Sequence, residues 1–105
     1  MRGHAQSRRD ANHKEIVDYA RKIGFSVLET HAIAGGLDLV VAIFGIDQRV
    51  EIKDGSKPPS ARKLTQAEKR TFDHWRGRKC LIWQSTDDVD ATRAGFVDEC
   101  LNGRR

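Results

Sequence analysis

The chain has 105 residues, of which 38% are hydrophobic and 32% are charged, which is the composition of one globular domain and not of a disordered tail. It carries 19 lysines and arginines against 15 acidic residues, a formal net charge of +4, and it holds no apolar run long enough to span a bilayer. The spacing of its cysteines and histidines is not typical of a zinc site. These features argue against a membrane-spanning or zinc-stabilised protein, and we expect it to be cytoplasmic.

In chain order, residues 1–9 are polar and basic and are predicted to form a flexible arm, and a single domain follows from 10 to 105. A helix is predicted from 10 to 23, because apolar residues recur there at helical spacing and Gly24 stands where a helix ends. Runs rich in strand-forming residues then predict three strands. These strands cover residues 25–31, 37–44 and 48–53, with turns at 34–36 and 45–47.

Residues 54–63 contain both prolines of the chain and are predicted to form a loop. Thr65 and Glu68 then have the spacing of a capping box, which predicts a helix that ends at Gly77. A buried-strand pattern at 80–84 precedes a last helix at 87–101. The inner face of that helix is predicted to comprise Val89, Phe96, Val97, Cys100 and Leu101.

The predicted order is therefore α-β-β-β-α-β-α. A helical crossover leads into the last strand, so we expect that strand to run parallel to a neighbour. The sequence thus predicts an α/β fold with a small mixed sheet flanked by helices.

An aspartate interrupts the apolar run of the second predicted strand. Burying a carboxylate is costly unless a charged or hydrogen-bonding group contacts it, so a carboxylate at Asp38 should have such a partner. In the third predicted strand, Glu51 and Lys53 alternate with apolar residues and point to one face of the sheet. A hairpin that brings Asp38 and Glu51 together with Lys53 would provide that partner.

The pairing register decides whether these side chains meet. Asp38 and Glu51 share a face only if paired residues on the two strands have numbers that sum to an odd value. A tight turn at residues 45–46 meets this condition and would place Val40 opposite Glu51 and Asp38 opposite Lys53. A slip of one residue would send the carboxylates to opposite faces.

Two carboxylates beside an ammonium group have the chemistry of a site for a divalent cation and a phosphate. Mg²⁺ prefers a few carboxylate oxygens and retains several waters. It would polarise a phosphodiester and lower the pKa of a bound water, while Lys53 would orient the nucleophile or offset charge at the scissile phosphate. The alternative is an exposed pair, Glu51 and Lys53, on an edge strand, with Asp38 as a strand-entry residue.

In these residues the chain resembles the PD-(D/E)XK nuclease superfamily, over about residues 10 to 85. That superfamily has a restriction-endonuclease-like αβββαβ core, with an acid on the second strand and Glu-x-Lys on the third. Here Gly36-Leu37-Asp38 stands where the family often has Gly-x-Pro-Asp, so Leu37 replaces the proline and the carboxylate is kept. The length and single-domain form look most like VRR-NUC and Holliday-junction-resolvase-like members, many of them encoded by phages. The predicted C-terminal helix is extra to this core.

The resemblance implies a Mg²⁺- or Mn²⁺-dependent endonuclease acting on DNA, with branched or structured DNA among its substrates, in a bacterial or phage-infected host cell. It implies Asp38 and Glu51 as metal ligands, the Ile52 carbonyl as a further donor, and Lys53 as a catalytic residue. It also points to Glu15 as a metal ligand on the first helix, where a solvated helix acid is the alternative. Gln66 would position water or phosphate, unless it is a plain helix-start residue. A homodimer would offer two sites to a branched or duplex substrate.

Basic residues follow the third predicted strand and suit contacts with phosphates that do not read bases, although solubilising charge is the alternative. These are Lys57, Arg62, Lys63, Lys69 and Arg70. We predict that Trp75 and Trp83 pack in the core and do not stack on bases. The cysteines, Cys80 and Cys100, are likewise predicted to be reduced core residues.

Two other functions stay open on the sequence. The first is a nucleic-acid-binding or assembly module that keeps the fold and has lost the chemistry; the presence of Asp38, Glu51 and Lys53 together argues against it. The second is a nuclease directed at RNA, because no residue pattern distinguishes a 2′-hydroxyl. No motif indicates sequence preference.

Overall fold

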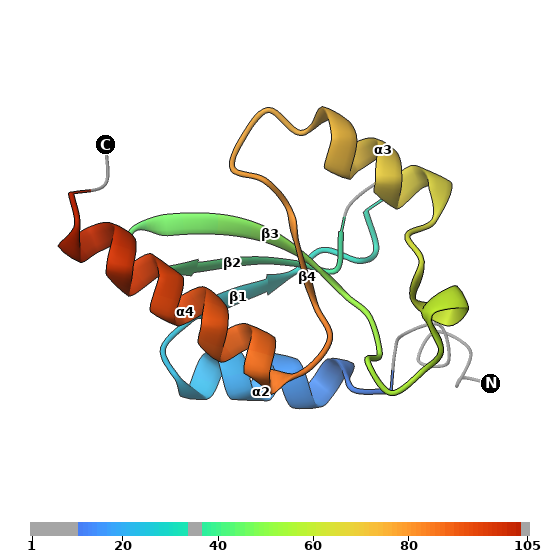
Figure 1. Ribbon diagram of the computed structural model, residues 1–105, viewed down its shortest axis with the longest axis horizontal. Helices are drawn as coiled ribbons and strands as arrows, with labels where there is room; N and C mark the ends of the chain where they lie inside the picture. The colour runs from blue at the N-terminus through green and yellow to red at the C-terminus, as the bar shows by residue number, and fades with distance from the viewer. Residues whose placement is uncertain (1–10, 34–36, 104–105) are drawn as a thin grey trace.

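The computed structural model describes residues 11–33 and 37–103, so the predicted arm at 1–9 and the turn at 34–36 lie outside the described residues. The described chain is a small α/β fold with a four-stranded mixed sheet (Figure 1). Its elements follow the predicted order. They are α2 (His13–Lys22), β1 (Ser26–Glu29), β2 (Leu39–Ile43), β3 (Ile46–Ile52), a 3₁₀ turn (Pro59–Arg62), α3 (Gln66–His74), β4 (Leu81–Trp83) and α4 (Thr86–Leu101).

The strands lie in the order β1-β2-β3-β4. The pairs β1-β2 and β2-β3 are antiparallel, whereas β3 and β4 are parallel, as the helical crossover through α3 predicts. Helix α2 packs against α4 and β1, and α4 packs against β4, while α3 lies apart from these two helices (Figure 1). No helix among the described residues is long and apolar enough to cross a membrane.

Alternation in β2 separates the two faces of the sheet. Leu39, Val41 and Ile43 are buried, whereas the residues between them are half-buried. The buried set joins side chains from both packed helices in one core. That core includes Ile16, Val17, Ala20, Phe25, Val50, Ile52, Trp83, Val89 and Phe96.

Three of the predicted core positions are wrong. Trp83 and Cys80 are buried as predicted, but Trp75 is 45% exposed and Cys100 is exposed. Leu101, on the predicted inner face of the last helix, is 79% exposed. The C-terminal end of α4 projects beyond the sheet, so apolar positions in its last turn have no core to face (Figure 1).

The turn between β2 and β3 differs from the predicted one by one residue. Ile43 pairs with Ile46, and the two turn residues are Phe44 and Gly45, with φ of 56° and 76°. Two successive positive φ angles are typical of a type I′ hairpin turn. A turn at 45–46 would have required Ile46 in that conformation, which a β-branched residue resists, and would have removed it from the core.

The fold makes one prediction about stability. Trp83 is 1% exposed, its Nε1 donates to Thr92 Oγ1 at 2.9 Å, and its ring meets Phe25 edge-on at 5.6 Å. Thr92→Val keeps the shape of the side chain and leaves the indole N–H buried without a partner, so we expect the free energy of unfolding to fall by about 1–3 kcal/mol. Urea denaturation would measure this. Thr92→Ser, which keeps the hydroxyl, should lose clearly less, and equal losses in the two variants would contradict the account.

Candidate functional site

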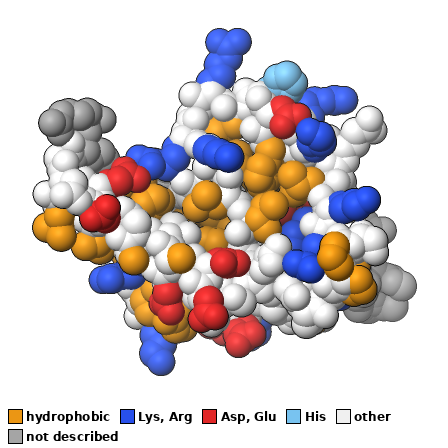
Figure 2. Space-filling model, in the orientation of Figure 1, with side chains coloured by type: hydrophobic (Ala, Val, Ile, Leu, Met, Phe, Trp, Pro, Cys, Tyr) orange, Lys and Arg blue, Asp and Glu red, His pale blue; other side chains and the backbone are white. Residues whose placement is uncertain are grey.

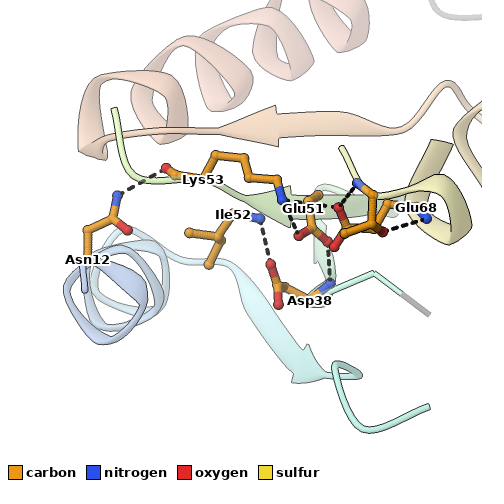
Figure 3. A network of polar contacts seen from close by, with 7 residues as sticks. Asn12, Asp38, Glu51, Ile52, Lys53 and Glu68 are labelled. Carbon is orange, nitrogen blue, oxygen red and sulfur yellow. Dashed lines mark hydrogen bonds and ion pairs between the residues drawn. The ribbon is translucent and has the colours of Figure 1, made fainter. Parts of the chain in front are cut away.

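The register brings Asp38 and Glu51 together. Leu39 pairs with Val50, so Asp38 lies opposite Glu51 and not opposite Lys53 as predicted, while the odd sum that places both acids on one face is kept. The Asp38 amide donates to Glu51 Oε1 at 3.3 Å, and the Ile52 amide donates to Asp38 Oδ2 at 2.8 Å (Figure 3). Each carboxylate is therefore fixed by the main chain of the neighbouring strand.

Both the backbone and the side chain of Lys53 have partners. Its amide donates to the Trp83 carbonyl of β4 at 3.0 Å, and its carbonyl accepts from Asn12 Nδ2 at 3.3 Å (Figure 3). Its side chain is only 11% exposed, and its Nζ lies 3.0 Å from Glu68 Oε1 and 3.6 Å from Glu51 Oε2. The ammonium group is thus directed at carboxylates and away from solvent.

Glu68 is a site residue that the sequence analysis missed. The capping box predicted for α3 is present: Glu68 N donates to Thr65 Oγ1 at 3.1 Å, and Thr65 N donates to Glu68 Oε1 at 2.9 Å. The same Glu68 oxygen accepts from Lys53. A glutamate interpreted only as a helix-start residue therefore also ties α3 to the acid pair. The signal available in the sequence was its place in the first turn of the helix that follows the Glu51-x-Lys53 strand.

The cluster has more carboxylates than cations. Burial raises the pKa of Glu51 to about 9, and the negative charge of Asp38 and the hydrogen bond with Glu68 add to the rise. Burial also acts to raise the pKa of Glu68, but hydrogen bonds from Glu51, the Thr65 backbone and Lys53 outweigh it and lower that pKa. At neutral pH these shifts favour a protonated Glu51 and an ionised Glu68.

Two predicted site residues lie outside this cluster of contacts. Gln66 is the first residue of α3, as predicted, and its side chain is exposed. Glu15 is exposed and lines a cavity of about 620 Å³ with residues that follow β3 and β4, among them Asp54, Gln84 and Asp88. The residues of α2 that face inward are His13 and then Ile16, Val17 and Ala20, so helical periodicity turns Glu15 outward.

The predicted phosphate-contacting residues occupy the loop after β3 and the helix α3. Lys57, Lys63, Lys69 and Arg70 are exposed, and Figure 2 shows Lys and Arg side chains around α3. Two of the five have protein partners: Lys69 pairs with Asp73 at 3.0 Å, and Arg62 Nη1 donates to Gln84 Oε1 at 3.2 Å. Arg62 is half-buried, so part of its role is to hold the loop to the end of β4.

The carboxylates present are of the type that binds a magnesium ion, but they are too few to coordinate it without water or substrate. Among the described residues, no three or more His, Cys, Asp or Glu side chains are grouped so that they could hold a metal ion, so the predicted set of Glu15, Asp38 and Glu51 does not form. Two contacting carboxylates remain, and Mg²⁺ is usually bound by one or two carboxylates together with waters and substrate phosphates. The excess of carboxylates over ammonium groups is a charge imbalance that such an ion would offset.

Comparison of the chain with protein-family models, with curated proteins and with solved structures finds no match. The geometry of Asp38, Glu51, Lys53 and Glu68 is therefore the only indication of function that the described residues give.

Proposed function

We propose that the protein is a metal-dependent nuclease that hydrolyses phosphodiester bonds in DNA. One observation carries the proposal: Asp38 lies opposite Glu51, with the Lys53 ammonium 3.6 Å from the Glu51 carboxylate. The α-β-β-β-α-β-α order of helices and strands, which the resemblance to the nuclease superfamily predicts, supports it. We propose the cytoplasm as its location.

In this proposal Asp38 and Glu51 hold Mg²⁺ or Mn²⁺, with the Ile52 carbonyl as a further donor. The ion, when bound, stabilises charge on the phosphate and makes water a stronger nucleophile at neutral pH. Glu51 has to lose its proton before it can act as a ligand, because metal ligands bind in their deprotonated form. The Ile52 amide keeps the Asp38 carboxylate oriented and would hold it in place for the ion.

Lys53 and α3 complete the proposed site. Lys53 offsets negative charge that develops at the scissile phosphate, and Glu68 positions its ammonium group. Gln66 lies at the N-terminus of α3, where the positive end of the helix dipole favours an anion. The exposed basic residues of the loop and of α3 would contact the DNA backbone.

A cleavage assay tests the proposal. Purified protein is incubated with plasmid, single-stranded, four-way-junction and RNA substrates in Mg²⁺, in Mn²⁺ and in EDTA. We expect metal-dependent cleavage that is lost in Asp38→Asn and in Glu51→Gln but kept in Asp47→Asn, which removes an exposed carboxylate from the same face of β3. Circular dichroism would establish that each variant is folded. Cleavage that persists in EDTA, or in both site variants, would refute the proposal.

A second candidate function is a nucleic-acid-binding or assembly module without catalysis. The observation that favours it is that the polar network is satisfied within the protein: both carboxylates accept from backbone amides, and Lys53 is paired. Such a network can serve structure alone. Tight metal-independent DNA binding with no cleavage of any substrate would support this module and reject the nuclease.

We also propose that the nuclease acts as a homodimer, because one small site cuts one strand and a two-fold assembly brings two sites to a duplex or junction. Light scattering coupled to size-exclusion chromatography, with and without DNA, would give the oligomeric state.

A further inference from the structure

Trp75 was predicted for the core, but the structure places it at the surface, in contact with a residue of β3. It directly follows α3 and is 45% exposed. The guanidinium carbon of Arg49 lies 4.3 Å from the centre of its ring. Arg49 Nε is buried and has no hydrogen-bond partner within the described residues, and the guanidinium makes a cation–π contact with the ring.

The ring also has a close neighbour in its own loop. A Cβ atom at Gly77 would lie 2.8 Å from Trp75 Nε1, so the chain after α3 turns back closely against the edge of the indole. The Arg49 guanidinium lies over the ring, and the residue as a whole is 45% exposed to solvent. Two contacts thus hold an aromatic surface open to a ligand.

This aromatic surface adjoins the proposed catalytic cluster. Arg49 and Glu51 lie on the same face of β3, two residues apart, which is about 7 Å along a strand. Val40 and Ile82, which pair with these two residues, are half-buried on the same face. Figure 2 shows apolar side chains gathered in the hollow between α3 and α4, with Lys and Arg side chains around them.

An aromatic ring backed by an arginine and bordered by basic residues is the arrangement that binds an unpaired nucleotide. Every base has a face that stacks on an indole, and the exposed basic residues Arg76 and Lys79, on the same loop, suit the phosphates. A base inside a duplex is already stacked on its neighbours and presents only its edges. The charge and the exposed ring together favour a single strand over an intact duplex.

We propose that Trp75 and Arg49 form a stacking site for an unpaired DNA base next to Asp38 and Glu51. The inference rests on the proposed function and names its substrate class: single-stranded DNA, or the unpaired region of a branched or flapped DNA. The site orders the strand so that the adjoining phosphate lies over the acid pair.

Binding measured in EDTA tests the stacking site without requiring catalysis. The chain has two tryptophans, and because Trp83 is 1% exposed, a bound base should quench the fluorescence of Trp75 alone. The probes are an oligothymidylate, an abasic deoxyribose-phosphate oligomer of the same length, a duplex and the matching RNA. We expect quenching by the oligothymidylate, and binding that is about 5- to 150-fold tighter than that of the abasic oligomer.

Variants separate stacking from general charge. Trp75→Ala should abolish the difference between the oligothymidylate and the abasic oligomer, and Trp75→Phe should restore part of it. Leu101→Ala removes a more exposed apolar side chain from the far end of α4 and should change neither affinity. Circular dichroism of each variant checks the fold.

Four results would overturn the stacking site: equal binding of the abasic oligomer, unchanged Trp75 emission on binding, tighter binding of the duplex, or tighter binding of the RNA. The same oligomers in Mg²⁺ test the nuclease independently. Quenching without cleavage would reject the proposed nuclease and leave the stacking site in place, whereas cleavage without quenching would do the reverse.

Discussion

Replacing Lys53 with methionine is expected to lower kcat for DNA cleavage by on the order of 10²–10³-fold, the effect of removing one preorganised charge from a transition state. Methionine keeps a long apolar side chain at this buried position and removes the ammonium that lies near Glu51 and Glu68. The loss should fall on kcat and not on DNA affinity, because the group is 11% exposed and points at carboxylates. Single-turnover cleavage at saturating metal would measure it.

Lys22→Met is the matched control, since Lys22 is exposed at the end of α2 and takes no part in the proposed site. Like Lys53→Met, it lowers the net charge of the protein by one. If Lys53→Met and Lys22→Met cleave equally well, Lys53 has no catalytic role, and its contacts with Glu51 and Glu68 are structural.

The meeting of Asp38 with Glu51 was predictable because it depends on parity alone. Side chains alternate with a period of two, so a turn shifted by one residue changes the sum of paired numbers by two and leaves both acids on the same face. The identity of the facing residues was not predictable in this way. The choice of Phe44 for a positive φ follows from keeping Ile43 and Ile46 in the core, which is a tertiary effect.

The two helix-borne acids show the other limit of sequence reasoning. The resemblance to the nuclease superfamily pointed to Glu15 as a metal ligand, with a solvated helix acid as the alternative. The buried face of α2 is formed by His13, Ile16, Val17 and Ala20, so Glu15 lies on the exposed side of the helix. Glu68 was assigned to a helix cap, and a capping residue was not expected to serve a second partner. The approach of α3 to β3, which brings it to Lys53, depends on the path of the loop between them.

Glu51→Gln is expected to make the metal-free protein more stable at alkaline pH. The pKa of Glu51 is about 9 in the folded protein and near 4.5 in the unfolded chain. Between these values the folded state binds a proton that the unfolded state has released, so the free energy of unfolding falls as pH rises, by up to about 1.36 kcal/mol per pH unit. Glutamine cannot ionise and still donates to Glu68, so the variant lacks this decline.

At pH 8 in EDTA we expect the variant to exceed the wild-type free energy of unfolding by on the order of 3 kcal/mol, a figure reduced from the full shift because Glu51 shares its proton with Glu68. Near pH 5 the two proteins should be about equally stable. Glu68 acts in the opposite sense, since its lowered pKa adds stability that is lost only in more acidic solution. Urea denaturation at intervals from pH 5 to pH 8.5 would trace both curves.

Metal addition at pH 8 then separates a binding site from a structural network. A ligand that binds only the folded state raises its stability by RT ln(1 + [L]/Kd), so Mg²⁺ or Mn²⁺ should recover the stability that wild type loses at this pH. Glu51→Gln, which lacks one carboxylate ligand, should gain little. If the free energies of unfolding of the two proteins change with pH in parallel, the pKa of Glu51 is not raised in the folded protein. If metal raises both free energies of unfolding equally, the ion binds elsewhere.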